Sequence, residues 1–362
     1  MHYNYCKQPD IFFISDRPDM NRGSYRIWVD YLVKSLTLIG FSAKIVHSNN
    51  IYKEVTNESF VIFDKGLSAS LINKVRSEIM LDVLFGSINP PAKDVLPVDF
   101  VIVGSREEAS RLSKYTNIIY VPLVELPLHY LPFKVHADRE VIKICYHGNA
   151  LHLSSFLSSG LKLALEDLQS ELKAAQRSLE LTIISNVEKP WWIIGKPDIN
   201  IKYLKYDWQT FPLQIVNYDI GIVPNCYNRS ANRPISYLLK KVLNMELSDS
   251  DIILRMKSKS NFGRLLVFMQ AGVPAVADLT PSHLELLGNL RYGFCASNRE
   301  SWLKGLRQLI YASERNKVAN EAKKYVSEKF DPVQWAQNFI EDITLIKKLT
   351  HEKDLKLSLN LN

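Results

Sequence analysis

Short apolar runs alternate with helix-like stretches along most of the chain. Ile11–Ser15 is an apolar, β-prone run, and Tyr25–Gly40, beyond a polar loop, carries apolar residues at helical spacing and ends at a glycine. Further apolar runs predict strands over 41–48, 61–66, 82–87 and 100–105. A helical pattern follows the last of them, over 106–115. Strands that alternate with helices in this way predict a parallel sheet with helices on both faces.

The same alternation starts again after a connecting segment. Residues 120–141 are rich in proline and have no period, which predicts an interdomain connection. Beyond it, strands are predicted at 141–148, 179–185, 220–224 and 273–278, and helices at 153–172, about 261–271 and 330–349. We therefore predict an α/β chain with two Rossmann-like, doubly wound domains. The predicted boundaries are 1–135, 136–335 and a C-terminal helix with its tail at 336–362.

Length and composition suit this interpretation. The chain has 362 residues, 46% of them hydrophobic and 23% charged, as expected for a soluble globular protein of two domains. Its four cysteines are scattered without metal-binding spacing, which indicates a reducing compartment and argues against structural zinc. The first residues do not resemble a signal peptide, and no apolar run approaches ~18 residues. We therefore expect a cytoplasmic protein.

The formal charge of +7 favours an anionic partner, although solubility alone would also account for it. Part of this charge is concentrated in one stretch, where four cations fall within ten residues: Arg255, Lys257, Lys259 and Arg264. Ser260 or Asn261 can cap the helix that follows and runs to about Ala271. A helix N-terminus favours phosphate, so these cations predict a diphosphate clamp. The alternative is a capped helix with a solvated basic first turn.

The order of motifs around this stretch resembles the C-terminal half of GT-B glycosyltransferases. The resemblance is carried by residues 219–224 (DIGIVP), 259–278 (KSNFGRLLVFMQAGVPAVAD), 281–287 (PSHLELL) and 292–310. The first strand, loop and helix, and the unit at 100–112, also resemble that family. The resemblance implies two Rossmann-like domains facing across a cleft, with the acceptor on the first, a nucleotide sugar on the second, and a last helix that crosses back to the first domain.

One family feature is missing. Many retaining members carry two glutamates, eight residues apart, on this helix, but Lys259 and Val267 occupy those positions here. The sequence instead resembles a variant with Lys-Ser followed by Arg, which occurs in some polysaccharide-assembly transferases. The donor sugar and the choice between retention and inversion stay open.

Further candidates for binding the donor come from loops that follow predicted strands. The resemblance implies that Glu285 accepts hydrogen bonds from ribose or sugar hydroxyls, although it could equally be an exposed helix residue. Backbone N–H groups could meet a phosphate at Gly148 and Asn149 in the second domain, and at Gly23 and Ser24 in the first. Tight turns would explain these glycines as well.

The candidates for a catalytic base are Asp16 and Asp19, on the loop after the first strand, and His147, with His152 as an alternative. Either aspartate could also be a solvated loop residue. The polar segment 224–234 could contact donor or acceptor, or form a surface loop. Asp249 and Asp251 match the metal-binding Asp-x-Asp of the other major glycosyltransferase fold, but their context favours a turn with a cap. We expect no metal and no cofactor.

The function that the resemblance implies is metal-independent transfer of a sugar from a nucleotide sugar to a glycan or lipid-linked glycan. The pathway would be surface polysaccharide biosynthesis (lipopolysaccharide O-antigen, capsule or exopolysaccharide), with peripheral contact to an anionic membrane. A sugar-nucleotide epimerase of the same fold and a non-catalytic partner subunit are the alternatives. Nucleic-acid binding is disfavoured because the cations do not interleave with aromatic residues. NAD chemistry is disfavoured because no Gly-x-Gly-x-x-Gly follows either first strand.

Overall fold

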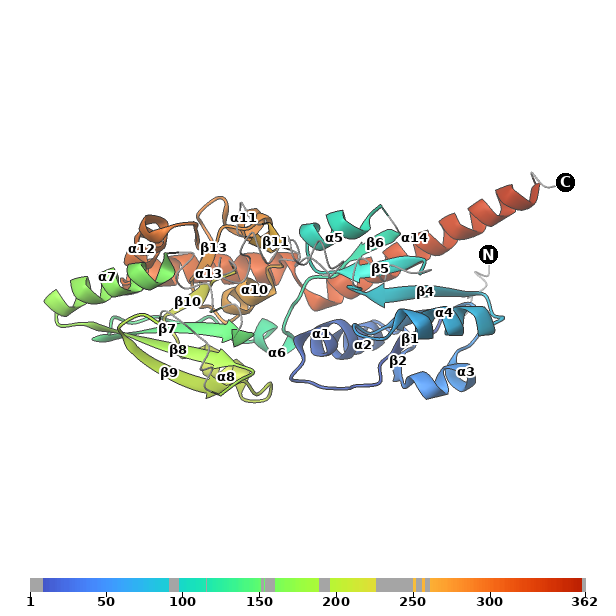
Figure 1. Ribbon diagram of the computed structural model, residues 1–362, viewed down its shortest axis with the longest axis horizontal. Coiled ribbons are helices and arrows are strands. Elements are labelled where there is room, and N and C mark those ends of the chain that lie inside the picture. The colour runs from blue at the N-terminus through green and yellow to red at the C-terminus, as the bar shows by residue number, and fades with distance from the viewer. Residues whose placement is uncertain are drawn as a thin grey trace, which may run out of the picture. The chain divides into compact units, whose positions relative to one another are not determined.

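The computed structural model describes residues 9–90, 98–114, 116–150, 153, 160–188, 196–225, 250–251, 256–257 and 261–359. Contacts divide the chain into two compact units (Figure 1). Unit 1 comprises Met1–Leu126 and Phe330–Asn362, and unit 2 comprises Pro127–Lys329. The second unit is therefore inserted, in sequence, between the two segments that form the first.

Unit 1 is built on a six-stranded sheet in the order β2-β1-β3-β4-β5-β6, and every pair in it is parallel. The strands are β1 (Ile11–Ile14), β2 (Ala43–Val46), β3 (Ser59–Phe63), β4 (Val83–Ile88), β5 (Phe100–Val103) and β6 (Asn117–Tyr120). The α-helices are α1 (Gly23–Tyr25), α2 (Leu32–Leu38), α3 (Ile51–Glu54), α4 (Ala69–Glu78), α5 (Arg106–Leu112) and α14 (Pro332–Leu359). A π-helix, η1 (Arg26–Tyr31), joins α1 to α2, and a short 3-10 helix, η2 (Ser48–Asn50), precedes α3.

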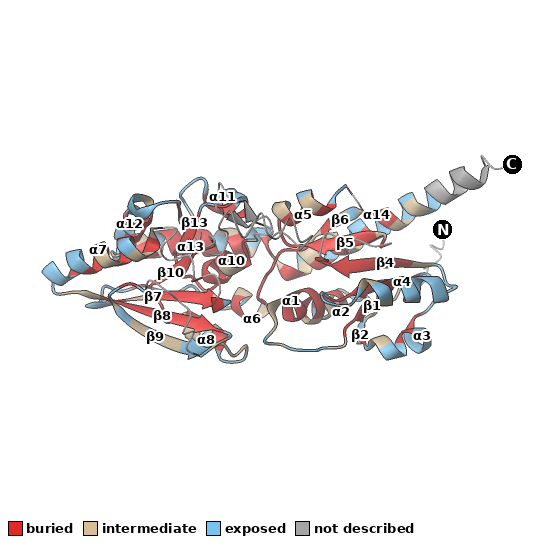
Figure 2. Cartoon of the chain, viewed as in Figure 1, coloured by how far each residue is buried: buried red, intermediate tan, exposed pale blue. Residues whose placement is uncertain are grey.

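The central strands of this sheet consist of buried residues, red at β4 and β5 in Figure 2. Successive residues of a strand point to opposite faces, so the continuous apolar run of β1 supplies both. Ile11 and Phe13 belong to the core under η1, α2 and α14, whereas Phe12 and Ile14 belong to the core under α3 and α4. The last helix contributes four buried residues to the first of these cores: Ala336, Phe339, Ile343 and Ile346.

Unit 2 has its own six-stranded parallel sheet, in the order β14-β13-β10-β7-β8-β9. Its strands are β7 (Val141–Gly148), β8 (Ser178–Ser185), β9 (Asn200–Lys205), β10 (Ile220–Val223), β13 (Ala275–Asp278) and β14 (Phe294–Ala296). The helices are α7 (Leu161–Ala174), α8 (Phe211–Ile215), α10 (Gly263–Gln270), α11 (Pro281–Leu287), α12 (Arg299–Gln308) and α13 (Ala312–Lys329). The short helix α6 (Leu126–His129) lies at the boundary between the units.

The core of unit 2 explains why α10 is apolar around most of its surface. Helices α7 and α12 pack on one face of the sheet, where Trp302 is fully buried. Helix α10 packs against β10 and β13 and is covered by α13. A Cβ on Gly221 would come within 2.6 Å of the Phe268 ring, so this glycine lets α10 approach β10 closely. A helix enclosed in this way needs no polar face.

The predicted α/β class with two doubly wound domains is confirmed. Two details of the sequence prediction are corrected. The helix predicted from residue 153 begins at Leu161, because Gly160 before it has a left-handed φ of 73°. The pair Ser250–Asp251 forms a short strand, β11, that pairs with β12 (Met256–Lys257), and not a capping turn. Asp249 lies outside the described residues.

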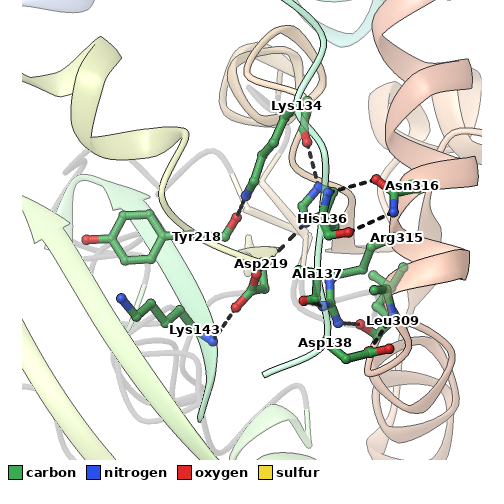
Figure 3. Close-up of polar contacts among 12 residues, drawn as sticks. Lys134, His136, Ala137, Asp138, Lys143, Tyr218, Asp219, Leu309, Arg315 and Asn316 are labelled. Carbon is green, nitrogen blue, oxygen red and sulfur yellow. Dashed lines mark hydrogen bonds and ion pairs between the residues drawn. The ribbon is translucent and has the colours of Figure 1, made fainter. Parts of the chain in front are cut away.

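At the amino edge of the sheet in unit 2, a buried polar cluster fixes the connecting segment (Figure 3). The Arg315 guanidinium is fully buried and donates to the carbonyls of Leu309, Ile310 and Ala137 at 2.7–2.9 Å. Asn316 bonds both the N–H and the carbonyl of His136. The second half of the predicted connection is therefore a fixed part of unit 2.

Lys323 belongs to the same edge and gives a pH-dependent prediction. Its ammonium donates to the Gln270 carbonyl at 2.7 Å, and burial lowers its pKa to about 8. Between pH 8 and about 10.4 the unfolded chain keeps a proton that the folded chain has lost, so stability rises with pH. We expect the free energy of unfolding of the unaltered protein, relative to Lys323→Met, to rise by about 2 kcal/mol between pH 7 and 10. Denaturant titrations at both pH values would show it.

The matched control is Lys324→Met, because Lys324 is exposed on the same helix. Its stability difference from the unaltered protein should be the same at both pH values. A pH-independent difference for Lys323→Met would contradict the assignment of a depressed pKa to this lysine.

Candidate functional site

The strand order of unit 2 marks one point on its sheet as the place for a ligand. From β7 the chain proceeds outward to β8 and β9, then returns to β10 on the other side of β7 and continues to β13 and β14. The order therefore reverses between β7 and β10. In doubly wound sheets, ligands bind at the carboxyl ends of the strands that flank such a reversal. Here β7 ends at Gly148 and β10 at Val223, with Pro224 and Asn225 next.

Arg264, in the first turn of α10, lies at this reversal. Its guanidinium donates to the Pro224 carbonyl at 3.0 Å and to the Asn225 Oδ1 at 2.9 Å. A third, longer bond of 3.4 Å reaches the Tyr146 hydroxyl, and the guanidinium lies 5.8 Å from the centre of that ring. Burial raises the pKa of Tyr146 to about 12, so this hydroxyl is neutral at pH 7. Within the described residues, the hydrogen bonds of the Arg264 side chain thus go to uncharged oxygens.

Gly148 makes room for this side chain. It has a φ of 129°, in the region that favours glycine, and a Cβ there would lie 2.8 Å from the Arg264 Cδ. The neighbouring Tyr146 hydroxyl donates to the Asn149 carbonyl at 2.6 Å, which fixes the turn after β7. Gly148 and Arg264, selected separately from the sequence, are therefore in contact.

We predict that Gly148→Ala lowers the free energy of unfolding by about 1–3 kcal/mol, because the new side chain meets both an unfavourable φ and the Arg264 methylene. Gly23→Ala is the control, since a Cβ there would come no nearer than 3.8 Å to a neighbour and its φ is not positive. Urea unfolding would measure both. Equal stability of the two variants would contradict the close packing of Arg264 on Gly148.

The predicted helix over about 261–271 is α10, which runs from Gly263 to Gln270. Its N-cap residue is Phe262, and the Asn261 side chain accepts from the Gly263 N–H at 3.2 Å. Lys257 lies in β12. Lys259 and Ser260 lie outside the described residues, so their part in a diphosphate clamp stays a prediction.

His147 supports α10. Its Nε2 lies 3.0 Å from the Arg264 carbonyl, and its ring contacts those of Phe268 and Phe211 at centroid distances of 4.9 and 5.2 Å. A ring nitrogen that bonds a carbonyl oxygen must carry the hydrogen, so Nε2 is a donor here. These contacts favour a role in seating the helix, and the role of His147 as catalytic base stays a prediction. His152 lies outside the described residues.

The other candidates lie on other elements, and their roles in binding or catalysis stay predictions. Glu285 is exposed on α11. In unit 1, Gly23 and Ser24 begin α1, after the loop that follows β1. On that loop the Asp16 carboxylate accepts from the Ser48 N–H and lies 3.6 Å from the His47 Nε2, and Asp19 accepts from the Asn21 N–H. Asp19 therefore stabilises a local turn, whereas Asp16 ties the loop after β1 to the start of η2.

Two aspartates that sequence reasoning missed occupy strand ends. Asp64 follows β3, at the strand reversal of unit 1, where it accepts from the Ser15 hydroxyl at 2.8 Å and pairs with Arg22. Burial raises the pKa of Asp64. Asp278 ends β13 and accepts from the Asn225 N–H through Oδ2. The only signal for either was a carboxylate directly after an apolar run.

No family model and no curated protein matches this sequence, but solved structures resemble the chain. Anabaena HepE in complex with UDP-glucose covers 92% of this chain, which covers 99% of HepE, at 8% identity and a TM-score of 0.57. S. aureus TarM, in complex with Fondaparinux, α-GlcNAc-glycerol and UDP, covers 83% of this chain at 11% identity and a TM-score of 0.53. An E. coli trehalose-6-phosphate protein bound to UDP-2-fluoro glucose covers 88% of this chain, which covers 78% of it, at 10% identity and a TM-score of 0.52.

The solved structures that resemble this chain are GT-B glycosyltransferases. The chain has the GT-B fold.

This GT-B chain spans 58% of the length of the TarM structure. Among its described helices, none is both long and apolar enough to cross a bilayer. The structure also groups no three metal-ligating side chains within the described part of the chain. Arg264 lies at the strand reversal of unit 2, and the hydrogen bonds of its side chain to described residues go to uncharged oxygens.

Proposed function

We propose that this protein is a glycosyltransferase that takes a sugar from a nucleotide-sugar donor, with UDP as the nucleotide. The observation that carries the proposal is Arg264. It lies at the strand reversal of unit 2, and its hydrogen bonds there go to uncharged oxygens. HepE, TarM and the E. coli trehalose-6-phosphate protein, which resemble this chain, were each solved with UDP or a UDP-sugar.

The geometry supports a simple division of roles. The Arg264 guanidinium and the N-terminus of α10 would receive the donor diphosphate, with Lys257 and Lys259 as further cations. These positive groups would stabilise the charge that develops on the leaving nucleotide as the glycosidic bond to the sugar breaks. Gly148 would let the phosphate and the Arg264 side chain approach the end of β7.

For the acceptor we propose a glycan or a lipid-linked glycan of a surface polysaccharide, used at the inner face of the cell membrane. TarM was solved with α-GlcNAc-glycerol, a small glycoside. The formal charge of +7 would favour contact with anionic lipids. Sedimentation with anionic and with neutral vesicles would test that contact, and equal recovery with both would argue against it.

The experiment that tests the donor proposal is a thermal-shift screen with UDP-, GDP-, dTDP- and CMP-sugars. A ligand that binds the folded state at 100 times its Kd stabilises it by about 2.7 kcal/mol, so a specific donor should give a clear rise in Tm. We expect the largest rise with a UDP-sugar. No shift with any nucleotide sugar would overturn the proposal, and interconversion of the sugar without an acceptor would indicate an epimerase instead.

A further inference from the structure

The hydrogen bonds of Arg264 leave a defined part of its guanidinium unused. The group carries five N–H bonds. Two Nη1 bonds go to the Tyr146 hydroxyl and the Pro224 carbonyl, and one Nη2 bond goes to the Asn225 Oδ1. The Nε–H and the second Nη2–H have no acceptor among the described residues. An Nε–H and an Nη2–H of one guanidinium are the donors with which arginine binds two oxygens of one oxyanion side-on.

Asn225, which accepts the other Nη2 hydrogen, is itself held in place. Asn225 is 3% exposed, and its backbone N–H donates to the Asp278 Oδ2. Asp278 is fully buried at the end of β13, next to β10 in the sheet. Its own carbonyl lies 2.7 Å from the Nδ1 of the buried His283. A continuous chain of hydrogen bonds therefore leads from Asp278 through Asn225 to Arg264.

The chemical type of Asn225 also matters. Its amide oxygen accepts a hydrogen bond from Arg264 without cancelling the charge of the guanidinium. A carboxylate at the same place would form a bidentate ion pair and satisfy the fork that is now unused. Asp278 does bring a carboxylate into this region, where its Oδ2 accepts a hydrogen bond from the Asn225 N–H.

We propose that Asn225 and Asp278 are positioning residues for the donor diphosphate. Asp278 fixes Asn225, and Asn225 fixes the Arg264 guanidinium so that its Nε–H and second Nη2–H remain available to a phosphate. This inference rests on the proposed function, because it assigns the oxyanion to a nucleoside diphosphate.

The decisive variant is Asn225→Asp, with UDP binding measured by isothermal titration calorimetry and Tm measured in the absence of ligand. The new carboxylate should pair with Arg264, so UDP binding should weaken about tenfold or more. Tm should not fall, because an ion pair replaces a hydrogen bond to a neutral oxygen. A role for Asn225 in folding alone predicts the opposite, a lower Tm with unchanged affinity.

Asn217→Asp is the matched control. Asn217 is exposed and precedes β10, at the amino edge of the same sheet, so the variant makes the same charge change away from Arg264. It should bind UDP as the unaltered protein does. The role of Asp278 is tested by comparing Asp278→Ala, which removes the acceptor of the Asn225 N–H, with Asp278→Asn, which keeps an oxygen there. The alanine variant should bind UDP about tenfold more weakly, and the asparagine variant should recover most of the loss.

The outcomes separate this inference from the function on which it rests. If the unaltered protein does not bind UDP, the proposed function fails and the inference fails with it. If the unaltered protein binds UDP and Asn225→Asp binds it equally well, only the inference is overturned. Equal affinity of the alanine and asparagine variants at position 278 for UDP would show that Asp278 does not position Asn225.

Discussion

Replacing Arg264 by alanine should lower kcat/KM for the nucleotide-sugar donor by about 10²–10³-fold, the usual cost of removing one group that stabilises an oxyanion. The variant removes the cation at the strand reversal of unit 2 and the fork of N–H donors that we assign to the diphosphate. It also leaves the Pro224 carbonyl and the Asn225 Oδ1 without this donor. Steady-state kinetics with the donor identified by the thermal-shift screen would measure the loss.

Two further variants show whether the charge or the fork is responsible. Arg264→Lys keeps the positive charge but loses the planar fork, and we expect about a tenfold loss. Arg307→Ala is the control, because Arg307 is an exposed arginine of the same unit whose guanidinium pairs with Glu171. Its kinetics should equal those of the unaltered protein. Activity of Arg264→Ala within about twofold of normal would refute the role of Arg264, since such a change is below 0.5 kcal/mol.

The second large effect concerns stability. Arg26 lies on the π-helix η1, where its Nε donates to the Glu125 Oε2 at 3.0 Å and a second nitrogen pairs with Oε1. Both side chains are less than 10% exposed. Arg26→Met leaves a buried carboxylate without its guanidinium, and removing one partner of a buried pair costs about 3–5 kcal/mol. We expect the free energy of unfolding of unit 1, measured by denaturant titration, to fall by this amount.

The loss of stability should come from the buried Glu125 carboxylate that is left unpaired, and not from the loss of the ion pair itself. The double variant Arg26→Met with Glu125→Leu should therefore recover much of the stability. Lys34→Met is the exposed control, because Lys34 pairs with Asp30 on the neighbouring turn and is 60% exposed. Surface pairs contribute about 0–1 kcal/mol. If Arg26→Met were no more destabilising than Lys34→Met, the buried pair would not stabilise unit 1.

The sequence pattern was most informative where strands are buried on both faces. The runs that became β1, β3, β5 and β7 are nearly continuous in apolar residues, because helices cover both sides of these central strands. Strands β6, β9 and β14 were not predicted. Each lies at an edge of its sheet and is partly exposed, so none needs a continuous apolar run. The pattern therefore revealed the fold class but not the full width of the sheets.

The candidate site could be predicted only in part, for a related reason. Arg264 and Gly148 stood out because a cation at a helix start and a glycine at a strand end have local signatures. Asn225 and Asp278 have none, since their importance depends on contacts that join residues 39 and 53 positions apart. The same holds for Arg26 and Glu125, which are separated by 99 positions. Periodicity cannot report pairs of this kind, because nothing in either segment specifies its partner.

The place of α14 in the chain has a consequence for biosynthesis. This helix supplies Ala336, Phe339, Ile343 and Ile346 to the core of unit 1, yet it is made after the whole of unit 2. As the chain leaves the ribosome, unit 2 has all its residues while unit 1 still lacks one wall of its core. Until α14 is made, the apolar residues of α2 that it contacts lack this partner. Synthesis of unit 1 thus begins before that of unit 2, but unit 2 is the first that can be completed.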